Sequence, residues 1–164
     1  MQKIAKFDFV SFDQFKAAYN KFTEEEVREY YENLRLPERS TKGSAGYDFK
    51  SPVSFYLKPG HAITIPTGIR AKIEDGWFLM CLPRSGMGFK YQICLANSVG
   101  IIDADFYNSD NEGHIHLKLV NRGDKTVTVD AGDNFAQGIF VPFGITYDDA
   151  ADGVRNGGFG STGR

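Results

Sequence analysis

Hydrophobic residues near the start of the chain follow the period of an α-helix. Over residues 11–36, aromatic and aliphatic residues recur every three or four positions, which places them on one face of a helix. They are Phe12, Phe15, Tyr19, Phe22, Val27, Tyr30, Tyr31 and Leu34. Ser11 with Gln14, and Thr23 with Glu26, match the capping box that begins many helices. The pattern predicts helices whose aromatic residues form packing stripes rather than a ligand site.

From Gly43 onward the pattern changes to short β-strands. β-branched and aromatic residues often alternate with polar ones, and glycine, proline or aspartate separates the runs at short intervals. The runs are "HAITIPTGIRAKI", "WFLMCLP", "GHIHLKLVN", "KTVTVDAG" and "FAQGIFVPF". No segment after Gly43 shows the pattern of an amphipathic helix, so strands do not alternate with helices as they do in a parallel sheet. An antiparallel sandwich, jelly roll or barrel is therefore predicted.

Composition narrows the class of protein. The 164 residues suit one domain with a substantial core, and a hydrophobic content of 41% is ordinary for a soluble globular protein. The net charge of −2 argues against a general nucleic-acid or membrane partner, because no basic excess is available to neutralise phosphates. Cys81 and Cys94 lie in apolar runs and are expected to be buried free thiols of a reducing compartment. Since the sequence shows no signal peptide or long apolar span, we expect a cytoplasmic protein.

Two glycine-containing stretches carry groups suited to binding phosphate. "GSAGYD" opens the β region, and "PRSGMGFK" follows an apolar strand and presents Arg84, Ser85 and the backbone of Gly86. An arginine, a hydroxyl group and a free N–H together can bind a diphosphate. A turn that merely contains an arginine is the alternative for this stretch taken alone.

"NSVGIIDADFYNSD" places two aspartates directly after an apolar run. In an extended chain, Asp103 and Asp105 would lie on the same side, with Ala104 opposite. A carboxylate beside an apolar segment can act as a general base toward water, whereas a polar turn after a buried strand is the alternative. Further along, "AGDNFAQGIF" contains Gln137, an amide at a position that is usually structural.

The C-terminal run "VRNGGFGSTGR" combines glycines with hydroxyl groups and arginine. Its backbone N–H groups, together with Arg155, Ser161 and Thr162, have the chemistry of a phosphate cradle, and Phe159 can stack on a base. No Gly-Lys-Ser/Thr follows, so the run is not a P-loop. A frayed, functionally silent tail is the alternative, because termini of this composition are commonly disordered.

Taken in order, "GSAGYD", "PRSGMG", "NSVGIID", "GDNFAQ" and "GGFGSTG" resemble the five motifs of the trimeric dUTPase family, hydrolases of nucleotide metabolism. The resemblance covers about Leu36 to Arg164. It implies an all-β jelly-roll barrel, a homotrimer with shared active sites, and hydrolysis of dUTP to dUMP and pyrophosphate. One subunit then supplies the uracil pocket, a second the phosphate-binding serine motif, and a third its tail as a lid.

The resemblance also implies a domain organisation. The whole chain, 1–164, forms one domain, with a helical insertion at 11–36, a jelly roll at 37–150 and a lid tail at 151–164. The helices have no counterpart in an ordinary family member. They are expected to interrupt the chain after a first strand near Lys3–Phe9 and to pack on the outside of the trimer.

Each candidate residue receives a role from the resemblance. Asp103 is the catalytic base for the water that attacks the α-phosphorus, and Phe106 stands where the family has a tyrosine whose ring excludes a 2′-hydroxyl. Uracil and deoxyribose are bound around Asn97, Gly100, Ile101 and Ile102. The phosphates and the stacked base are bound by Arg84, Ser85, Gly86, Gln137, Arg155, Phe159, Gly160, Ser161 and Thr162. Magnesium is held mainly by phosphates and water, with Asp48 and Asp105 as candidates for its outer shell and structural roles as their alternative.

The sequence departs from the family pattern in several places. Arg155 stands one residue closer to the glycines than the usual arginine, which leaves its contact with the γ-phosphate open. Asn134 and Phe135 replace an arginine and an aliphatic residue, which removes a contact of the usual pattern. The hairpin after Phe106, "YNSDNEGHIH", is longer than usual. His116 falls near a position that lines the sugar pocket and is a candidate substrate-binding residue, with a structural role as the alternative.

Two other functions stay open from the sequence alone. A dCTP deaminase shares the fold and the trimer but needs a glutamate base in the third motif, where Glu112 is the only glutamate. A regulatory binding module would use the dUTPase scaffold and the helical insertion at 11–36 to contact a partner, with or without catalysis.

Overall fold

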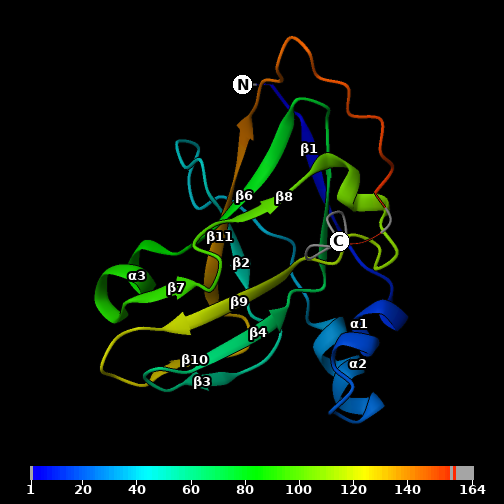
Figure 1. The fold of residues 1–164 in the computed structure, drawn as a ribbon. Coiled ribbons are helices and arrows are strands. Elements are labelled where there is room, and N and C mark those ends of the chain that lie inside the picture. The colour runs from blue at the N-terminus through cyan, green and yellow to red at the C-terminus, as the bar shows by residue number, and fades with distance from the viewer. Residues whose placement is uncertain (1, 156, 158–164) are drawn as a thin grey trace.

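Short antiparallel strands make up most of the regular structure in the computed structural model, which describes residues 2–155 and 157 (Figure 1). The strands are β1 (Ala5–Phe9), β2 (Tyr47–Lys50), β3 (Phe55–Leu57), β4 (Ala62–Pro66), β5 (Ile69–Ile73), β6 (Trp77–Pro83), β7 (Ile93–Leu95), β8 (Gly100–Ile102), β9 (His116–Asn121), β10 (Val127–Val129) and β11 (Asn134–Pro142). The helices are α1 (Phe12–Ala18), α2 (Glu24–Glu32), α3 (Ser85–Tyr91) and the 3₁₀ helix η1 (Ala104–Asn108). The predicted all-β, jelly-roll-like fold is confirmed.

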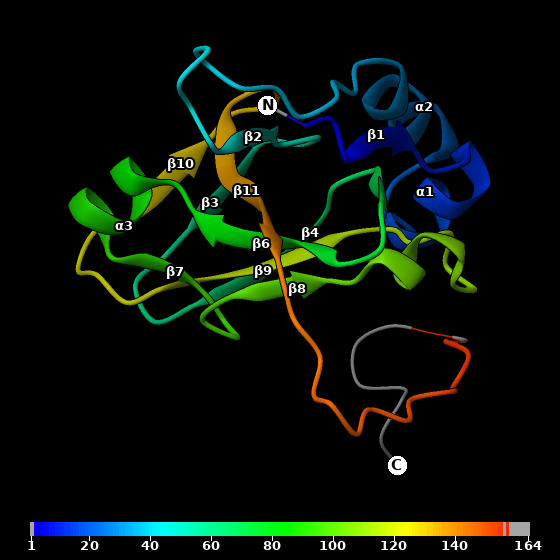
Figure 2. The same ribbon diagram turned by 90° about the horizontal axis from the view of Figure 1, so that it is seen from above.

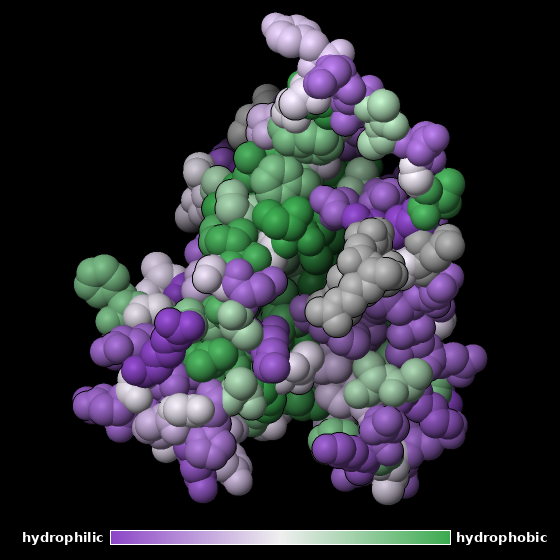
Figure 3. All heavy atoms as spheres, in the orientation of Figure 1, coloured by the Kyte–Doolittle hydropathy of each residue, from purple (hydrophilic) through white to green (hydrophobic). Residues whose placement is uncertain are grey.

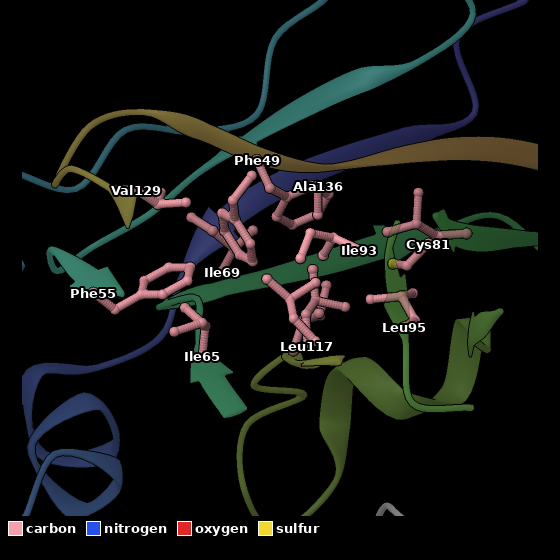
Figure 4. Packing of buried hydrophobic residues seen from close by; sticks show 14 of the residues in the cluster. Phe49, Phe55, Ile65, Ile69, Cys81, Ile93, Leu95, Leu117, Val129 and Ala136 are labelled. Carbon is pink, nitrogen blue, oxygen red and sulfur yellow. The ribbon is translucent and has the colours of Figure 1, made fainter. Parts of the chain in front are cut away.

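Two sheets enclose the main core. One has the strand order β2-β11-β6-β8 and the other the order β4-β9-β7, while β10-β3 and β1-β5 form two-stranded sheets. Inward-facing side chains alternate along the strands, and in β6 Leu79 and Cys81 are both fully buried. Figure 4 shows Phe49 and Ala136 from the first sheet pointing toward Ile65 and Leu117 from the second.

The two N-terminal helices pack on a second, smaller core. Thr23 and Glu26 form a complete capping box, and the Ser11 side chain accepts a hydrogen bond from the Gln14 N–H, so both predicted helix starts are confirmed. Glycine is required where these helices meet the β region. A Cβ on Gly68, whose φ is +75°, would lie 2.6 Å from a Leu34 methyl group.

Helix bounds are where the sequence-based prediction needs correction. α2 ends at Glu32, four residues before the predicted end of the helical region. A third helix, α3, occupies part of the stretch expected to be a turn, and η1 also follows Gly43. None of the α3 residues is fully buried, and Met87 packs against the main core while partly exposed, so the helix lacks the buried apolar stripe that a periodic pattern would reveal. Among the helices of the described residues, none has the length and apolar character needed to cross a bilayer.

The two cysteines differ in environment. Cys81 is buried in the core, and burial raises the pKa of its thiol to about 12. Cys94 is only partly buried, and its Sγ lies 3.9 Å from the carbonyl oxygen of Val120. Both are free thiols, as predicted. The prediction that both are buried is right for Cys81 and wrong for Cys94.

Candidate active site

A pocket of about 450 Å³ opens between β7, β8 and β9. The predicted uracil- and sugar-binding residues all line it, namely Asn97, Gly100, Ile101, Ile102, Asp103 and Phe106. His116 and Arg155 line it as well. A volume of this size is typical of small-molecule sites.

The strand β8 forms one wall of the pocket, and all three of its residues line it. β8 is the last strand in its sheet, and Gly100 lies opposite Cys81 of β6. A Cβ on Gly100 would lie 3.1 Å from the Cys81 Cβ, so a glycine fits closely at this crossing. Because β8 pairs with β6 on one side only, the other edge of its backbone is not used within this sheet.

Asp103 stands at the end of β8, where the chain enters η1. The Asp103 side chain is 46% exposed and the Asp105 side chain 56%. Arg155 joins them, because its Nη2 lies 2.5 Å from Asp103 Oδ2 and its Nε donates to Asp105 Oδ1 over 2.7 Å. The two carboxylates thus share one side, as predicted, although the chain between them is a 3₁₀ turn rather than an extended strand.

Two histidines pack beside the pocket. The rings of His114 and His116 are perpendicular, with centroids 4.4 Å apart. His114 is fully buried, and its Nε2 accepts a hydrogen bond from the Gly68 N–H at 2.8 Å. Burial, and secondly the charge on His116, lower the pKa of His114 to about 3, and burial also lowers the pKa of His116. Near neutral pH the pocket wall therefore carries an uncharged imidazole pair.

A second polar cluster surrounds Arg84. Its Nε lies 3.1 Å from Asp48 Oδ1, while Asp48 Oδ2 accepts hydrogen bonds from Ser40 and Asn134. Gln137 Nε2 donates to the carbonyl oxygen of Pro83 at 3.1 Å. Asp48 is buried and has protein partners on both carboxylate oxygens, which favours its structural interpretation.

The cluster around Arg84 and the pocket lie at opposite ends of β6. Leu79 of β6 pairs with Ile102, so Asp103 lies near the start of β6, whereas Arg84 follows its last residue. Six residues of extended chain span about 20 Å. Figure 2 shows the same separation, with α3 at one end of the molecule and the chain beyond β8 at the other. The structure therefore does not bring Arg84, Ser85, Gly86 and Gln137 to the pocket of their own chain.

The sequence-based prediction of the site and the structure differ at several residues. Lys118 lines the pocket and was not selected from the sequence, although its alternation with His116 on β9 is a usable signal. Glu112, the glutamate that a deaminase would need, does not line this pocket and accepts hydrogen bonds from Ser11 instead. The predicted lid residues Phe159, Gly160, Ser161 and Thr162 lie outside the described residues.

Comparisons with known proteins identify the family. The dUTPase family model matches residues 32–163. A deoxyuridine 5′-triphosphate nucleotidohydrolase from Lactococcus lactis is 41% identical over 148 residues, which cover 84% of this chain and 95% of that protein. The corresponding protein of Bordetella pertussis is 38% identical over 152 residues, or 88% of this chain and 95% of that one.

Solved structures show the same relationship. The crystal structure of dUTPase from Streptococcus mutans is 33% identical, has a TM-score of 0.64, and covers 85% of this chain and 97% of its own. A mutant dUTPase from phage phi11 of S. aureus shares the fold at 20% identity, with a TM-score of 0.65 over 92% of this chain and 98% of its own. The chain belongs to the dUTPase family.

Proposed function

We propose that this dUTPase hydrolyses dUTP to dUMP and pyrophosphate, with Asp103 as the general base. The observation that carries the proposal is the position of Asp103, whose half-exposed carboxylate lies at the end of the pocket wall formed by β8. A carboxylate there can accept the proton of a water molecule as that water attacks the α-phosphorus. Positioned general bases of this kind contribute on the order of 10²–10⁴-fold to rate.

The pocket is suited to deoxyuridine. The unpaired edge of β8 from Gly100 to Ile102 offers backbone donors and acceptors, which in this proposal pair with the uracil edge and select it over cytosine. Phe106 is almost fully buried in the pocket wall, and its ring is proposed to pack beneath the sugar and exclude a 2′-hydroxyl. Asn97 and His116 complete the proposed base and sugar contacts.

The phosphate-binding groups come, in this proposal, from a second chain of a homotrimer. Arg84 lies about 20 Å from Asp103 of its own chain, by the strand rise along β6. Ser85 and Gly86 follow it in α3, and Gln137 lies opposite Leu82 near the same end of β6. A complete site therefore requires the Arg84 end of one subunit beside the Asp103 end of another. The tail would close over the substrate, with Arg155 exchanging its two carboxylate partners for phosphate and Phe159, Gly160, Ser161 and Thr162 acting as the lid.

The outward face of the four-stranded sheet supports assembly with other copies. Met80 lies opposite both Ile101 and Ile139, and Phe78 lies opposite Val141, so neighbouring strands present apolar side chains on the face away from the core. Figure 3 shows hydrophobic atoms gathered over the region where Figure 1 places β6 and β8. An apolar face of this kind is typical of a subunit interface.

Magnesium is the proposed cofactor. Mg²⁺ prefers oxygen ligands, and in this proposal phosphates and water supply them, with the exposed carboxylate of Asp105, two residues after the pocket residue Asp103, near the outer shell. Because both carboxylate oxygens of Asp48 already have protein partners, Asp105 is the better candidate for the outer shell. When bound to the triphosphate, the ion would neutralise phosphate charge. A reducing compartment such as the cytoplasm suits the two free thiols.

Product analysis tests the proposed reaction. The protein is incubated with dUTP, dCTP, dTTP or UTP and Mg²⁺, and the products are separated by chromatography. We expect dUMP and pyrophosphate from dUTP and little product from the other three. Asp103→Asn should retain nucleotide binding and lower kcat by about 100-fold or more. Release of ammonia from dCTP, or near-full kcat in Asp103→Asn, would overturn the proposal.

Mixed trimers test the shared site. Asp103→Asn and Arg84→Ala chains, each inactive alone, are dissociated together and reassembled. Hybrid trimers should recover activity, because some sites then combine an intact Asp103 with an intact Arg84. If hybrid trimers form and stay inactive, the site is not shared between chains in this way.

A further inference from the structure

The segment predicted as a hairpin joins β8 to β9, which lie in different sheets, and the N-terminal helices are hydrogen-bonded to it through Ser11 and Glu112. Ser11, the N-cap of α1, donates both its backbone N–H and its Oγ–H to the Glu112 carboxylate, over 2.7 and 2.6 Å. The two residues are 101 positions apart in the sequence. Glu112 belongs to residues 107–113, the end of η1 and the turn after it, named here the 107–113 turn, which is part of the segment longer than the family pattern. The two unusual segments of this chain are thus joined to each other.

The 107–113 turn is also bound tightly to η1, which carries Phe106. Ser109 donates through both its N–H and its Oγ to the Phe106 carbonyl oxygen. The Gly113 N–H donates back to Ser109 Oγ, and a Cβ on Gly113 would lie 2.7 Å from that same carbonyl oxygen. Glu112 itself has a φ of +57°, an unfavourable backbone conformation that its neighbours must hold in place. A displacement of Glu112 would therefore also move Phe106, because only a few hydrogen bonds separate the two residues.

Arg70 holds the other side of this turn. Its guanidinium lies 3.6 Å from the ring centroid of Tyr107, and its Nη2 donates to the Tyr107 carbonyl oxygen at 2.6 Å. The Tyr107 hydroxyl donates to Asp8 of β1 at 3.0 Å, and Arg70 Nη1 lies 4.0 Å from Glu112. Since β1 leads directly into Ser11, these contacts close a ring of interactions around the turn.

A second route connects α1 to the pocket through the histidines. The Phe15 ring of α1 lies 6.3 Å from the His114 ring, and His114 packs against His116, which lines the pocket. The helices therefore support two neighbouring parts of the pocket wall. One is reached through Glu112 and the 107–113 turn, and the other through His114.

We propose that Glu112 is a positioning residue for substrate specificity, through which the N-terminal helices hold Phe106 against the sugar. The inference rests on the proposed function of the pocket. Steric rejection of a 2′-hydroxyl works only if the wall cannot retreat, so a loosened turn would admit ribose and bind deoxyribose less well. Chemistry at Asp103 would continue once the substrate is bound.

The test compares four variants by their steady-state kinetics with dUTP and UTP. Glu112→Ala removes both hydrogen bonds from Ser11. Glu112→Gln keeps an oxygen that accepts one of them. Ser11→Ala removes the hydroxyl donor together with the side-chain cap of α1, and keeps the backbone N–H donor. Thr23→Ala is the matched control, because it removes the capping box of α2 in the same helical segment without touching the 107–113 turn.

We expect Glu112→Ala to raise the KM for dUTP about fivefold to tenfold and leave kcat within about twofold of the unchanged protein. Its preference for dUTP over UTP should fall about tenfold, which is the scale of one charge-assisted hydrogen bond. Glu112→Gln should recover most of the preference, and Ser11→Ala should lose about twofold to threefold. In the Glu112→Ala background, Ser11→Ala should cause no further loss of preference. Thr23→Ala should lower the melting temperature and keep both KM and the preference.

A different pattern would overturn the inference. If Glu112→Ala and Glu112→Gln both keep the dUTP preference and KM while the melting temperature falls as in Thr23→Ala, Glu112 only stabilises the fold. Should Glu112→Ala fail to fold, an unchanged preference in both Glu112→Gln and Ser11→Ala leads to the same conclusion. Failure of the proposed function looks different, because the unsubstituted protein would then fail to release pyrophosphate from dUTP.

Discussion

Mild acid should destabilise this dUTPase through one buried histidine, His114. Its Nε2 accepts the Gly68 N–H, and the described atoms offer no hydrogen-bond partner to its Nδ1. A protonated ring would point an N–H at the Gly68 N–H and leave the other N–H unsatisfied in a buried place. Burial, and then the charge on His116, therefore lower the pKa of His114 from 6.5 to about 3.

The magnitude follows from proton linkage. In the unfolded chain His114 binds a proton below pH 6.5, whereas in the folded protein it stays neutral down to about pH 3. Its contribution to stability is therefore present above pH 6.5 and is lost progressively as the pH falls from 6.5 toward 3. At pH 5, which is about 1.5 units below the unfolded pKa, the loss is about 2 kcal/mol per chain.

Urea unfolding at pH 7, 6 and 5 and fixed chain concentration measures this effect. His114→Gln is the test variant, because the glutamine oxygen can still accept the Gly68 N–H and does not titrate. The free-energy difference between the unsubstituted protein and His114→Gln should change by about 2 kcal/mol between pH 7 and pH 5. His61→Gln replaces an exposed histidine and is the control. Equal pH slopes for the unsubstituted protein and His114→Gln would refute the reasoning.

Three further predictions concern single sites. Gln92 ends α3 with a φ of 55° and a ψ of 34°, so Gln92→Gly should stabilise the protein by about 0.5–1 kcal/mol, seen as a higher urea midpoint; a lower midpoint contradicts this. In native protein an aromatic disulfide reagent should modify Cys94 and spare Cys81, whose thiol has a raised pKa, until urea is added; rapid native labelling of both would be inconsistent with the fold. Arg155→Gln should lower kcat/KM for dUTP about tenfold if the guanidinium moves from Asp103 to phosphate, and an unchanged value would remove Arg155 from the site.

Local patterns in the sequence were sufficient for several features. The capping box of Thr23 and Glu26 and the aromatic spacing predicted the N-terminal helices, because a helix start depends on residues three or four positions apart. The apolar run "WFLMCLP" predicted a strand from neighbouring residues alone, and the structure forms β6 there with Leu79 and Cys81 on its buried face. The pocket residues from Asn97 to Phe106 could be selected from one continuous stretch, and the structure places them together.

Only the tertiary structure decided which distant residues meet. Ser11 and Glu112 are 101 positions apart, and no periodic pattern links a helix cap to a hairpin turn. The opposite placement of Arg84 and Asp103 along β6 is likewise set by strand pairing, although both belong to motifs that the sequence reveals. α3 was not predicted because none of its residues is fully buried, so its seven residues show no periodic apolar stripe. Short-range geometry is encoded by neighbours in the chain, whereas the pairing of strands and the packing of loops depend on the shape of the whole core.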